Sequence, residues 1–437
     1  MNPAARRILL GLPSAALGLA TTLPAQDDPQ AVVADAAPPP ATGWIEPVLP
    51  AEWQDPEEPP EPPDRWVWDA DGLLSLHLTD WGSKNTSSDG IDTQTATVIL
   101  TGRYGDDFLL WVEPDFDGED TRHNLSELWG EWAIDGSRWV RVGQYRVSLG
   151  TEFETRAEDL LFVGYAYPAW LYGRHDTGVR YDAYAGDNWW WMAGATAGEG
   201  FDLDGEERED PLLVLRGALT PDQHVDEYGR REFEGVFGGA AWAYSNQGDD
   251  RVYQATPLGQ TTFETPELNG DSTNYLQYEA GVRASSFRFG FEYVVGDVTE
   301  VPSGAPGDTN DMEELTSWAG YLAWNFTGDA PRWERGGWAP YTQTDYNAGK
   351  ELPVELGFRY SNSDMDRDLF DFGVIPFDPS SQETRTLSTA LSAHLNPDTR
   401  LALQWLYVIV DDDGLAVFDG EDRTSNIVLR WDQWFGR

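Results

Sequence analysis

Strict alternation between apolar and polar residues recurs in many short segments of this 437-residue chain. In one segment the apolar positions are Leu276, Tyr278, Ala280, Val282 and Ala284, and the residues between them are Gln277, Glu279, Gly281 and Arg283. A β-strand places successive side chains on opposite faces, so a period of two indicates a strand with two different surroundings. These surroundings are either a protein core and water, or lipid and a water-filled lumen.

The alternating segments predict an all-β protein of about sixteen strands, each roughly 8–14 residues long. We expect the strands to start near Gly72, Thr93, Asp107, Leu125, Arg138, Arg174, Asp187, Asp210, Phe233, Thr273, Phe287, Glu314, Leu352, Thr384, Thr399 and Arg423. The residues between these segments show no convincing pattern of an amphipathic helix.

The lengths of the connections alternate as well. Tight turns follow several even-numbered strands, at residues 105–106, 135–137, 186–187, 285–286 and 396–398. Long acidic connections follow the odd-numbered strands, at residues 80–92, 146–173, 198–210, 246–272, 296–313, 361–383 and 411–422. This segregation is typical of an outer-membrane barrel, so we predict a transmembrane antiparallel β-barrel. The connections at 220–232 and 328–351 are longer than the pattern requires.

A barrel also determines which face meets lipid. A charge in the middle of the lipid face costs roughly 2–4 kcal/mol, so the charged faces must line the lumen. Tryptophans near strand ends suit aromatic girdles at two membrane interfaces, whereas core tryptophans of a soluble β protein would need no such placement. The candidates for girdle positions are Trp66, Trp81, Trp111, Trp189, Trp318, Trp338 and Trp405. The last strand alternates Ile427, Leu429, Trp431, Gln433 and Phe435, a pattern that resembles the outer-membrane assembly signal.

The N-terminal part of the chain divides into two further segments. Residues 1–25 have the pattern of a secretory signal peptide, with Arg6 and Arg7 before an apolar stretch and Ala25 at a plausible cleavage point. Residues 26–65 are rich in proline and acidic residues and contain almost no basic residue, which predicts a disordered spacer. A tether to another envelope component is the alternative for this segment. The predicted barrel occupies residues 66–437.

The composition excludes some functions. The formal net charge is −47, which disfavours nucleic acid as a partner. This acidity indicates either a solvated, salt-adapted surface or a field that attracts cations. The chain has no cysteine and none of the common catalytic motifs, so we expect neither an enzyme nor a cofactor. Acidic clusters at 115–120, 202–206 and 411–413 could bind Ca²⁺, although none has the EF-hand spacing.

Two stretches resemble the phosphate-selective porin O and P family. The first spans residues 138–179 and contains WVRVGQYR at 139–146, LG at 149–150 and GRHDTGV at 173–179; the second is the hairpin LNPDTRL at 395–401. The resemblance implies a sixteen-stranded barrel, commonly a homotrimer, whose third extracellular loop folds into the pore. It also implies inward arginines and lysines that select phosphate. The scarcity of lysine and the acidic residues of the third loop argue against transferring that selectivity.

The candidate site is a constriction between wall arginines and the loop at residues 147–172. The inward arginine candidates on the wall are Arg141, Arg180, Arg283, Arg288, Arg359 and Arg430, and the charged residues of the loop are Glu152, Glu154, Arg156, Glu158 and Asp159. An arginine arc that faces an acidic loop would create a transverse field across the pore. Alternatively, these charges pair with one another and only stiffen the wall.

The sequence therefore predicts an outer-membrane porin in a bacterium of the Gram-negative type, with the N-terminal spacer in the periplasm. Its partners would be small hydrophilic solutes or ions, including anions such as phosphate, and the lipid and lipopolysaccharide of the membrane. The alternatives are a barrel specific for acidic polysaccharides or oligosaccharides, a soluble secreted carbohydrate-binding β protein, and a plugged structural barrel.

Overall fold

The computed structural model contains two units, residues 1–61 and 62–437, and the elements described below all belong to the second unit. The described residues are 66–81, 90–105, 107–114, 116, 125–156, 159–186, 188–197, 211–220, 223–225, 231–245, 254–255, 263–264, 272–302, 309–328, 330–339, 353–364, 383–396, 398–410 and 423–435. The predicted signal peptide and spacer lie outside the described residues. Within the described residues, no helix is long and apolar enough to cross a membrane.

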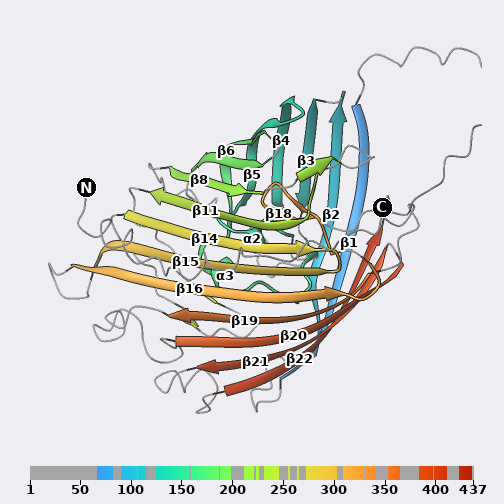
Figure 1. Cartoon of the computed structure of the whole chain (residues 1–437), viewed down its shortest axis with the longest axis vertical. Coiled ribbons are helices and arrows are strands. Elements are labelled where there is room, and N and C mark those ends of the chain that lie inside the picture. The colour runs from blue at the N-terminus through green and yellow to red at the C-terminus, as the bar shows by residue number, and fades with distance from the viewer. Residues whose placement is uncertain are drawn as a thin grey trace, which may run out of the picture. The chain divides into compact units, whose positions relative to one another are not determined.

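The described strands form a closed barrel of sixteen antiparallel strands, as the alternation predicts (Figure 1). The barrel strands are β1 (Trp66–Trp81), β2 (Gly90–Tyr104), β3 (Phe108–Pro114), β4 (Leu125–Asp135), β5 (Arg138–Val147), β6 (Arg174–Ala185), β7 (Trp189–Thr196), β8 (Leu212–Leu219), β11 (Gly235–Ser245), β14 (Ser272–Ala284), β15 (Phe287–Pro302), β16 (Thr309–Asn325), β19 (Val354–Asp364), β20 (Glu383–Asn396), β21 (Thr399–Val410) and β22 (Arg423–Phe435). The last strand closes the barrel by pairing with β1, from Gly72 with Phe435 to Trp81 with Asn426. The largest differences from the predicted starts are at β1 and β16, which begin earlier than expected.

The two faces of the wall have the predicted surroundings. On β19, Phe358 is 49% exposed on the outside, whereas its neighbour Arg359 is 4% exposed inside the barrel. The tryptophan predictions are confirmed for Trp66 and Trp189, which are exposed on the outer face at the starts of β1 and β7. Trp318 and Trp405 are also exposed on the outer face but lie in the middle of β16 and β21. The predictions are wrong for Trp111 and Trp338. Trp111 stacks on the buried Trp129, and Trp338 is itself buried inside the barrel. The side chain of Trp81 lies outside the described residues.

The two ends of the barrel differ, and we call them the long-loop end and the turn end. The turn end carries the tight turns and also the two connections that are too long for the predicted pattern. The first of these contains the hairpin of β9 (Gln223–Val225) and β10 (Arg231–Phe233). The second contains the hairpin of β17 (Trp333–Glu334) and β18 (Gly337–Trp338). At the long-loop end, β12 (Gln254–Ala255) pairs with β13 (Phe263–Glu264) between β11 and β14.

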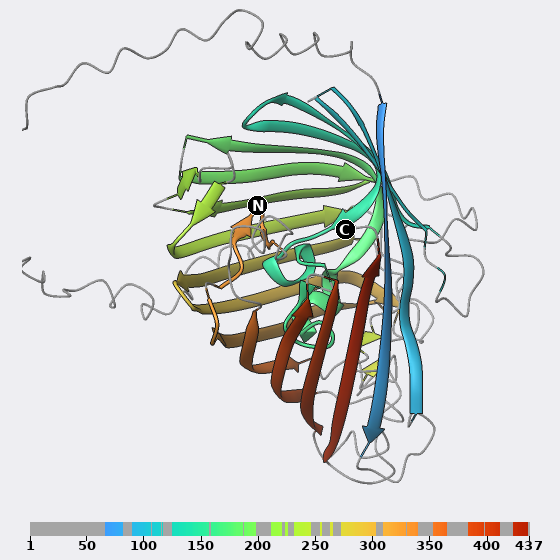
Figure 2. The same ribbon diagram turned by 90° about the vertical axis from the view of Figure 1, so that its right-hand side faces the viewer.

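The connection between β5 and β6, residues 148–173, folds into the barrel, and we call it the inward loop. It contains two short helices that the sequence pattern does not predict, α2 (Thr151–Glu154) and α3 (Tyr167–Tyr172). Proline in the first turn of α3 suits a helix start, where the backbone N–H needs no partner within the helix. Figure 2 shows both helices enclosed by the barrel strands. Contacts with the barrel wall hold both helices in place.

Candidate functional site

The inward loop is fixed by hydrogen bonds to strands that are not its neighbours in the barrel wall. The Thr151 N–H and Oγ1 both donate to Glu279 Oε2 on β14, at 3.1 and 2.6 Å. The Glu152 N–H donates to Glu292 Oε1 on β15 at 2.6 Å. Buried backbone donors need partners, and these wall carboxylates supply them. The inward loop therefore crosses the lumen and narrows it.

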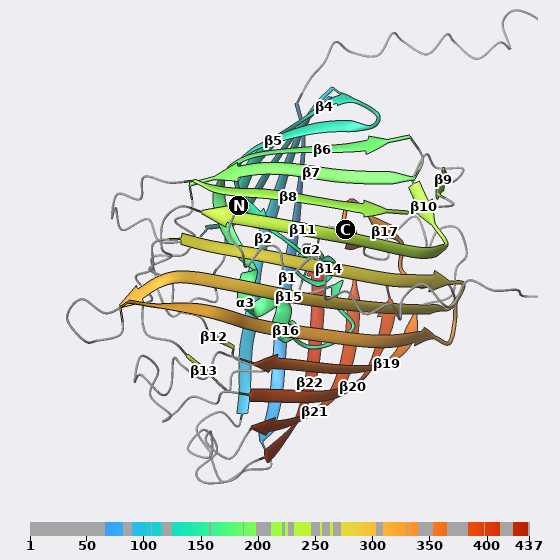
Figure 3. The same ribbon diagram turned by 60° about the vertical axis from the view of Figure 1, so that its left-hand side comes forward.

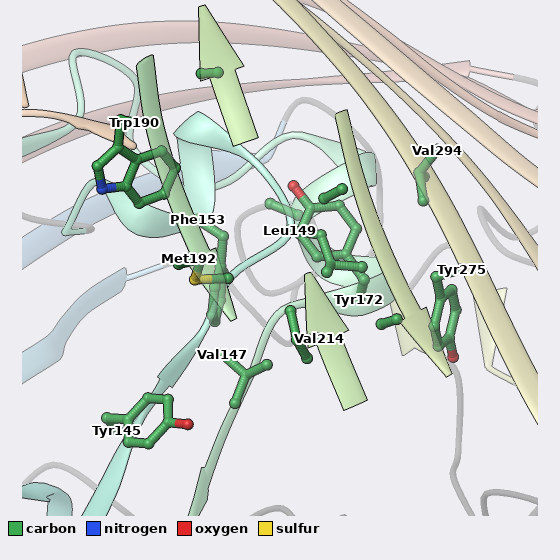
Figure 4. Close-up of a cluster of buried hydrophobic side chains, with 14 of the residues drawn as sticks. Tyr145, Val147, Leu149, Phe153, Tyr172, Trp190, Met192, Val214, Tyr275 and Val294 are labelled. Atoms are coloured by element: carbon green, nitrogen blue, oxygen red, sulfur yellow. The ribbon is translucent and has the colours of Figure 1, made fainter. Parts of the chain in front are cut away.

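Apolar packing supports the same arrangement (Figure 4). Leu149, Phe153 and Tyr172 of the inward loop belong to one buried cluster with Trp190 on β7 and Val214 on β8. Burying such side chains contributes roughly 1.5–3 kcal/mol each. The cluster fills the lumen between the inward loop and this part of the wall, so a water-filled passage must lie elsewhere.

Glycines at the two ends of the inward loop allow it to approach its neighbours closely. A Cβ at Gly150 would lie 2.0 Å from the Gln277 side chain and 2.4 Å from Glu292 Oε2. At Gly173 a Cβ would lie 2.3 Å from the Phe153 ring and 2.4 Å from the carbonyl oxygen of Ala169. At Gly173 the backbone carbonyl cannot turn aside, so a side chain there would shift the loop, whereas at Gly150 the neighbouring side-chain ends would have to move.

Replacing Gly173 by alanine is expected to lower the free energy of unfolding by about 1–3 kcal/mol, as happens when a packed site is overfilled. Urea unfolding of the protein in lipid vesicles, followed by tryptophan fluorescence, would measure the change. Gly136→Ala is the matched control, because a Cβ at Gly136 meets nothing within 4 Å. Equal stabilities of the two variants would contradict the close packing.

Two of the predicted wall arginines meet the inward loop. Arg359 donates to Glu152 Oε1 at 2.6 Å and to the Gly164 carbonyl at 2.9 Å. Arg180 lies 3.0 Å from Glu154 and 2.8 Å from Asp182. Burial raises the pKa of the Glu152 carboxyl, while the Arg359 guanidinium opposes that rise.

Two further arginines stack on tryptophans beside strands β3 and β4. Trp111 and Trp129 are parallel, with ring centroids 5.5 Å apart. The Arg141 guanidinium lies 3.9 Å from the Trp129 ring centroid and pairs with Glu131 on β4 at 2.9 Å. Arg156 of the inward loop lies 5.1 Å from the Trp111 centroid and pairs with Glu113 on β3 at 2.8 Å. Arginine and tryptophan attract each other electrostatically in this geometry.

The remaining predicted site residues lie in other surroundings. Arg283 donates to the carbonyls of residues 330 and 331, Arg288 pairs with Glu355 at 3.3 Å, and Arg430 pairs with Asp432 at 2.7 Å. Asp159 belongs to the inward loop, where its N–H donates to the Arg156 carbonyl. Glu158 lies outside the described residues. The structure thus brings only part of the predicted arginine arc to the inward loop, and the described arginine side chains are interleaved with carboxylates.

Sequence reasoning missed several charged residues that the structure places at this site, among them Arg216 and Arg335. Arg216 on β8 is fully buried and forms two hydrogen bonds with Glu279, at 2.9 and 2.8 Å. Strand β8 is apolar on both faces apart from Arg216, but an arginine in a barrel strand is costly on the lipid face, so the residue type itself held a usable signal. Arg335 lies in the turn between β17 and β18 and donates to both carboxylate oxygens of Glu131 at 2.8 Å. A turn residue has no alternation, so the sequence held no comparable signal for Arg335.

The exposure of these charged side chains locates the passage. Arg156 and Arg335 keep 21% of their side-chain surface exposed and Glu154 keeps 15%, whereas Arg216 has none. The three exposed side chains all have ion-pair partners on strands β3 to β6. Burial would lower the pKa of the Arg335 guanidinium, but Asp182 and Glu131 raise it, so Arg335 stays charged. The candidate constriction is the space between the inward loop and strands β3 to β6.

Metal binding has no support in the described part of the chain, where no cluster of acidic or histidine side chains could hold an ion. The acidic clusters predicted as Ca²⁺ candidates lie almost entirely outside the described residues. Calcium binding by these clusters therefore stays a prediction.

Comparison with known proteins shows the fold. No family model and no curated protein sequence matches the chain. OprB of Pseudomonas putida in its high-pH structure has 11% identity and a TM-score of 0.53 over 85% of this chain and 94% of that one. An anion-selective porin from Comamonas acidovorans has 11% identity and a TM-score of 0.52 over 85% and 100%. The trimer form of OmpT, an outer membrane protein of Vibrio cholerae, has 12% identity and a TM-score of 0.52 over 85% and 100%. The chain has the barrel fold that these proteins share.

Proposed function

We propose that this chain is an outer-membrane porin, a water-filled channel for the passive diffusion of small hydrophilic or ionic solutes. The observation that carries the proposal is the closed sixteen-stranded barrel with an apolar outer face and a charged inner face. A soluble β protein would not expose a continuous apolar outer surface to water. The likeness in fold to solved outer-membrane proteins supports the proposal.

The constriction would sort solutes by size and by local field. The inward loop and its apolar cluster narrow the lumen, so a solute passes beside the exposed parts of Glu154, Arg156 and Arg335. Charges and hydrogen-bonding groups that line a narrow passage replace part of the hydration of a solute. Because each of these charges is paired with a charge of opposite sign on the wall, the channel would have weak ionic preference, and we do not assign phosphate as its particular solute.

We place the proposed porin in the outer membrane of a bacterium of the Gram-negative type, in contact with lipid and lipopolysaccharide. The long-loop end would face outward and the N-terminal spacer would lie in the periplasm, as is usual for barrels with short periplasmic turns. A homotrimer fits the family resemblance of the sequence. The OmpT structure of similar fold is described as a trimer form.

Single-channel recording in planar bilayers tests this proposal. We expect conductance from the refolded protein and, in a KCl gradient, a permeability ratio for K⁺ over Cl⁻ close to one. Arg156→Ala should raise this ratio about two- to fivefold, which corresponds to the roughly 0.4–1 kcal/mol of a partly exposed charge. Absence of any conductance from a folded, heat-modifiable barrel would contradict the porin function.

A plugged structural barrel is the second candidate, and the buried cluster inside the lumen favours it. Such a barrel would resist urea and shift on heating in gels, yet it would not conduct. Swelling of proteoliposomes in small sugars separates the two candidates, because only an open passage admits the sugar.

A barrel specific for oligosaccharides is the third candidate. The cavity between the inward loop and strands β19 to β21, lined by Tyr165, Arg359, Thr386 and Gln404 among others, has room for only about one water molecule, so this candidate rests on the sequence and not on that cavity. Block of the conductance by an oligosaccharide but not by phosphate would favour this candidate over a general porin.

A further inference from the structure

A second segment enters the barrel, from the end opposite to the inward loop. It is the hairpin of β17 and β18 with its flanking residues, 330–339, which we call the turn-end hairpin (Figures 1 and 3). Trp333 and Trp338 of the hairpin are buried in the same apolar cluster as the inward loop. The hairpin therefore lies inside the lumen, where its two tryptophans face the helix α2.

Hydrogen bonds connect the turn-end hairpin to both threonines of the inward loop. The Trp338 N–H donates to Thr155 Oγ1 at 2.9 Å, and Trp333 Nε1 donates to Thr151 Oγ1 at 3.3 Å. The Gly336 carbonyl accepts from Arg216 at 2.6 Å. The two segments thus meet each other and share one buried arginine, although they start from opposite ends of the barrel.

Glycine at position 337 makes this contact close. A Cβ there would lie 3.1 Å from the Glu154 carbonyl carbon and 3.1 Å from the Thr155 nitrogen. Both neighbours are backbone atoms, which cannot turn aside as the end of a side chain can. A larger residue at 337 must therefore move the hairpin away from α2.

Arg335 occupies the tip of the turn-end hairpin and is held from several sides. Its φ is +48°. This backbone conformation is unfavourable for any residue other than glycine, and it persists only where surrounding contacts hold it. Its N–H donates to the Tyr184 hydroxyl at 3.1 Å, and its guanidinium lies 4.6 Å from the Trp139 ring centroid. Together with the paired Glu131 oxygens, these contacts direct the cation towards strands β4 to β6.

We propose that the turn-end hairpin is the second half of the constriction and that Arg335 is a selectivity-determining residue of the channel. This inference rests on the proposed porin function. Glu131 and Asp182 both lie within ion-pair distance of Arg335. Loss of the guanidinium leaves an excess of negative charge on this side of the passage. Small inorganic anions such as chloride then lose the positive charge that attracts them there.

Reversal potentials in a KCl gradient test the role of Arg335. Arg335→Ala should raise the K⁺ over Cl⁻ permeability ratio about two- to fivefold, the size expected for a partly exposed charge. Arg335→Lys should keep the wild-type ratio, because it keeps the charge. Arg138→Ala is the matched control, since Arg138 pairs with Asp135 at the same end of the barrel but is half exposed and lies at the start of β5, outside the constriction. An unchanged ratio in a conducting Arg335→Ala channel would overturn the inference and leave the porin function intact.

A second pair of variants tests the docking itself and does not depend on the charge. Gly337→Val should displace the hairpin and produce a larger or fluctuating single-channel conductance. Gly328→Val changes the same connection at a position where a Cβ meets nothing within 4 Å, so its conductance should equal that of the wild type. Identical traces from both variants would contradict a constriction built from two segments. If the wild type itself does not conduct, the porin function and this inference both fail.

Discussion

Replacing Arg216 by alanine is expected to lower the free energy of unfolding by about 3–5 kcal/mol, the usual result when one partner of a buried ion pair is removed. Arg216 is fully buried and donates to both carboxylate oxygens of Glu279. The variant would leave the Glu279 carboxylate inside the barrel without this guanidinium. It would also remove the donor to the Gly336 carbonyl, so both segments inside the lumen would lose an anchor.

Urea unfolding in lipid vesicles, with tryptophan fluorescence as the signal, measures this loss. Arg138→Ala removes an exposed arginine at the start of β5 and should change the free energy of unfolding much less than Arg216→Ala does. The double variant Arg216→Met with Glu279→Met should be more stable than either single variant, since it leaves no unpaired charge in the interior. A loss from Arg216→Ala as small as that from Arg138→Ala would contradict the central role of the buried pair.

The strands of the barrel were predictable because alternation is a local property of the sequence. Residues 276–284 show this well. The side chains predicted to point inward are buried, and those predicted to point outward are partly or fully exposed. The start of β1 at Trp66 was missed because its first residues are almost all apolar or acidic and do not alternate clearly. A pairing partner on β2 extends β1 there, from Trp66 with Tyr104 onwards. Such pairing is a contact between distant residues that periodicity does not report.

The segments inside the lumen were harder to predict for the same reason. Helix α2 has only four residues and is held by Glu279 and Glu292, which are more than a hundred positions away in the chain. For the turn-end hairpin, the sequence indicates only a connection longer than the pattern requires. The inward direction of Arg359 was predictable from the alternation of β19. The sequence also placed Glu152 in the inward loop, but it did not predict the ion pair between the two residues. Arg335 could not be found, because its position depends on Glu131 and Tyr184.

A charge on the outer face gives the second large effect. Leu322→Arg is expected to make folding into a bilayer less favourable by about 2–4 kcal/mol, the cost of an arginine at mid-depth on the lipid side of a barrel. Leu322 is 48% exposed on β16 and lies between Phe289 and Phe358 of the neighbouring strands. Aromatic pairs bracket it along the strand: Trp318 with Tyr360 towards the long-loop end, and Trp324 with Phe326 towards the turn end.

The position of these aromatic pairs makes the control decisive. Leu395 is equally exposed but lies at the turn end of β20, beyond the aromatic residues, so Leu395→Arg should cost only about 0–1 kcal/mol. Urea titration of both variants in vesicles of one lipid composition measures the difference. In water an exposed leucine tolerates arginine at either position, because both side chains would be solvated. Equal, small effects at the two sites would therefore mean that the apolar outer face does not meet lipid, whereas a difference that depends on depth is a signature of a barrel that spans the membrane.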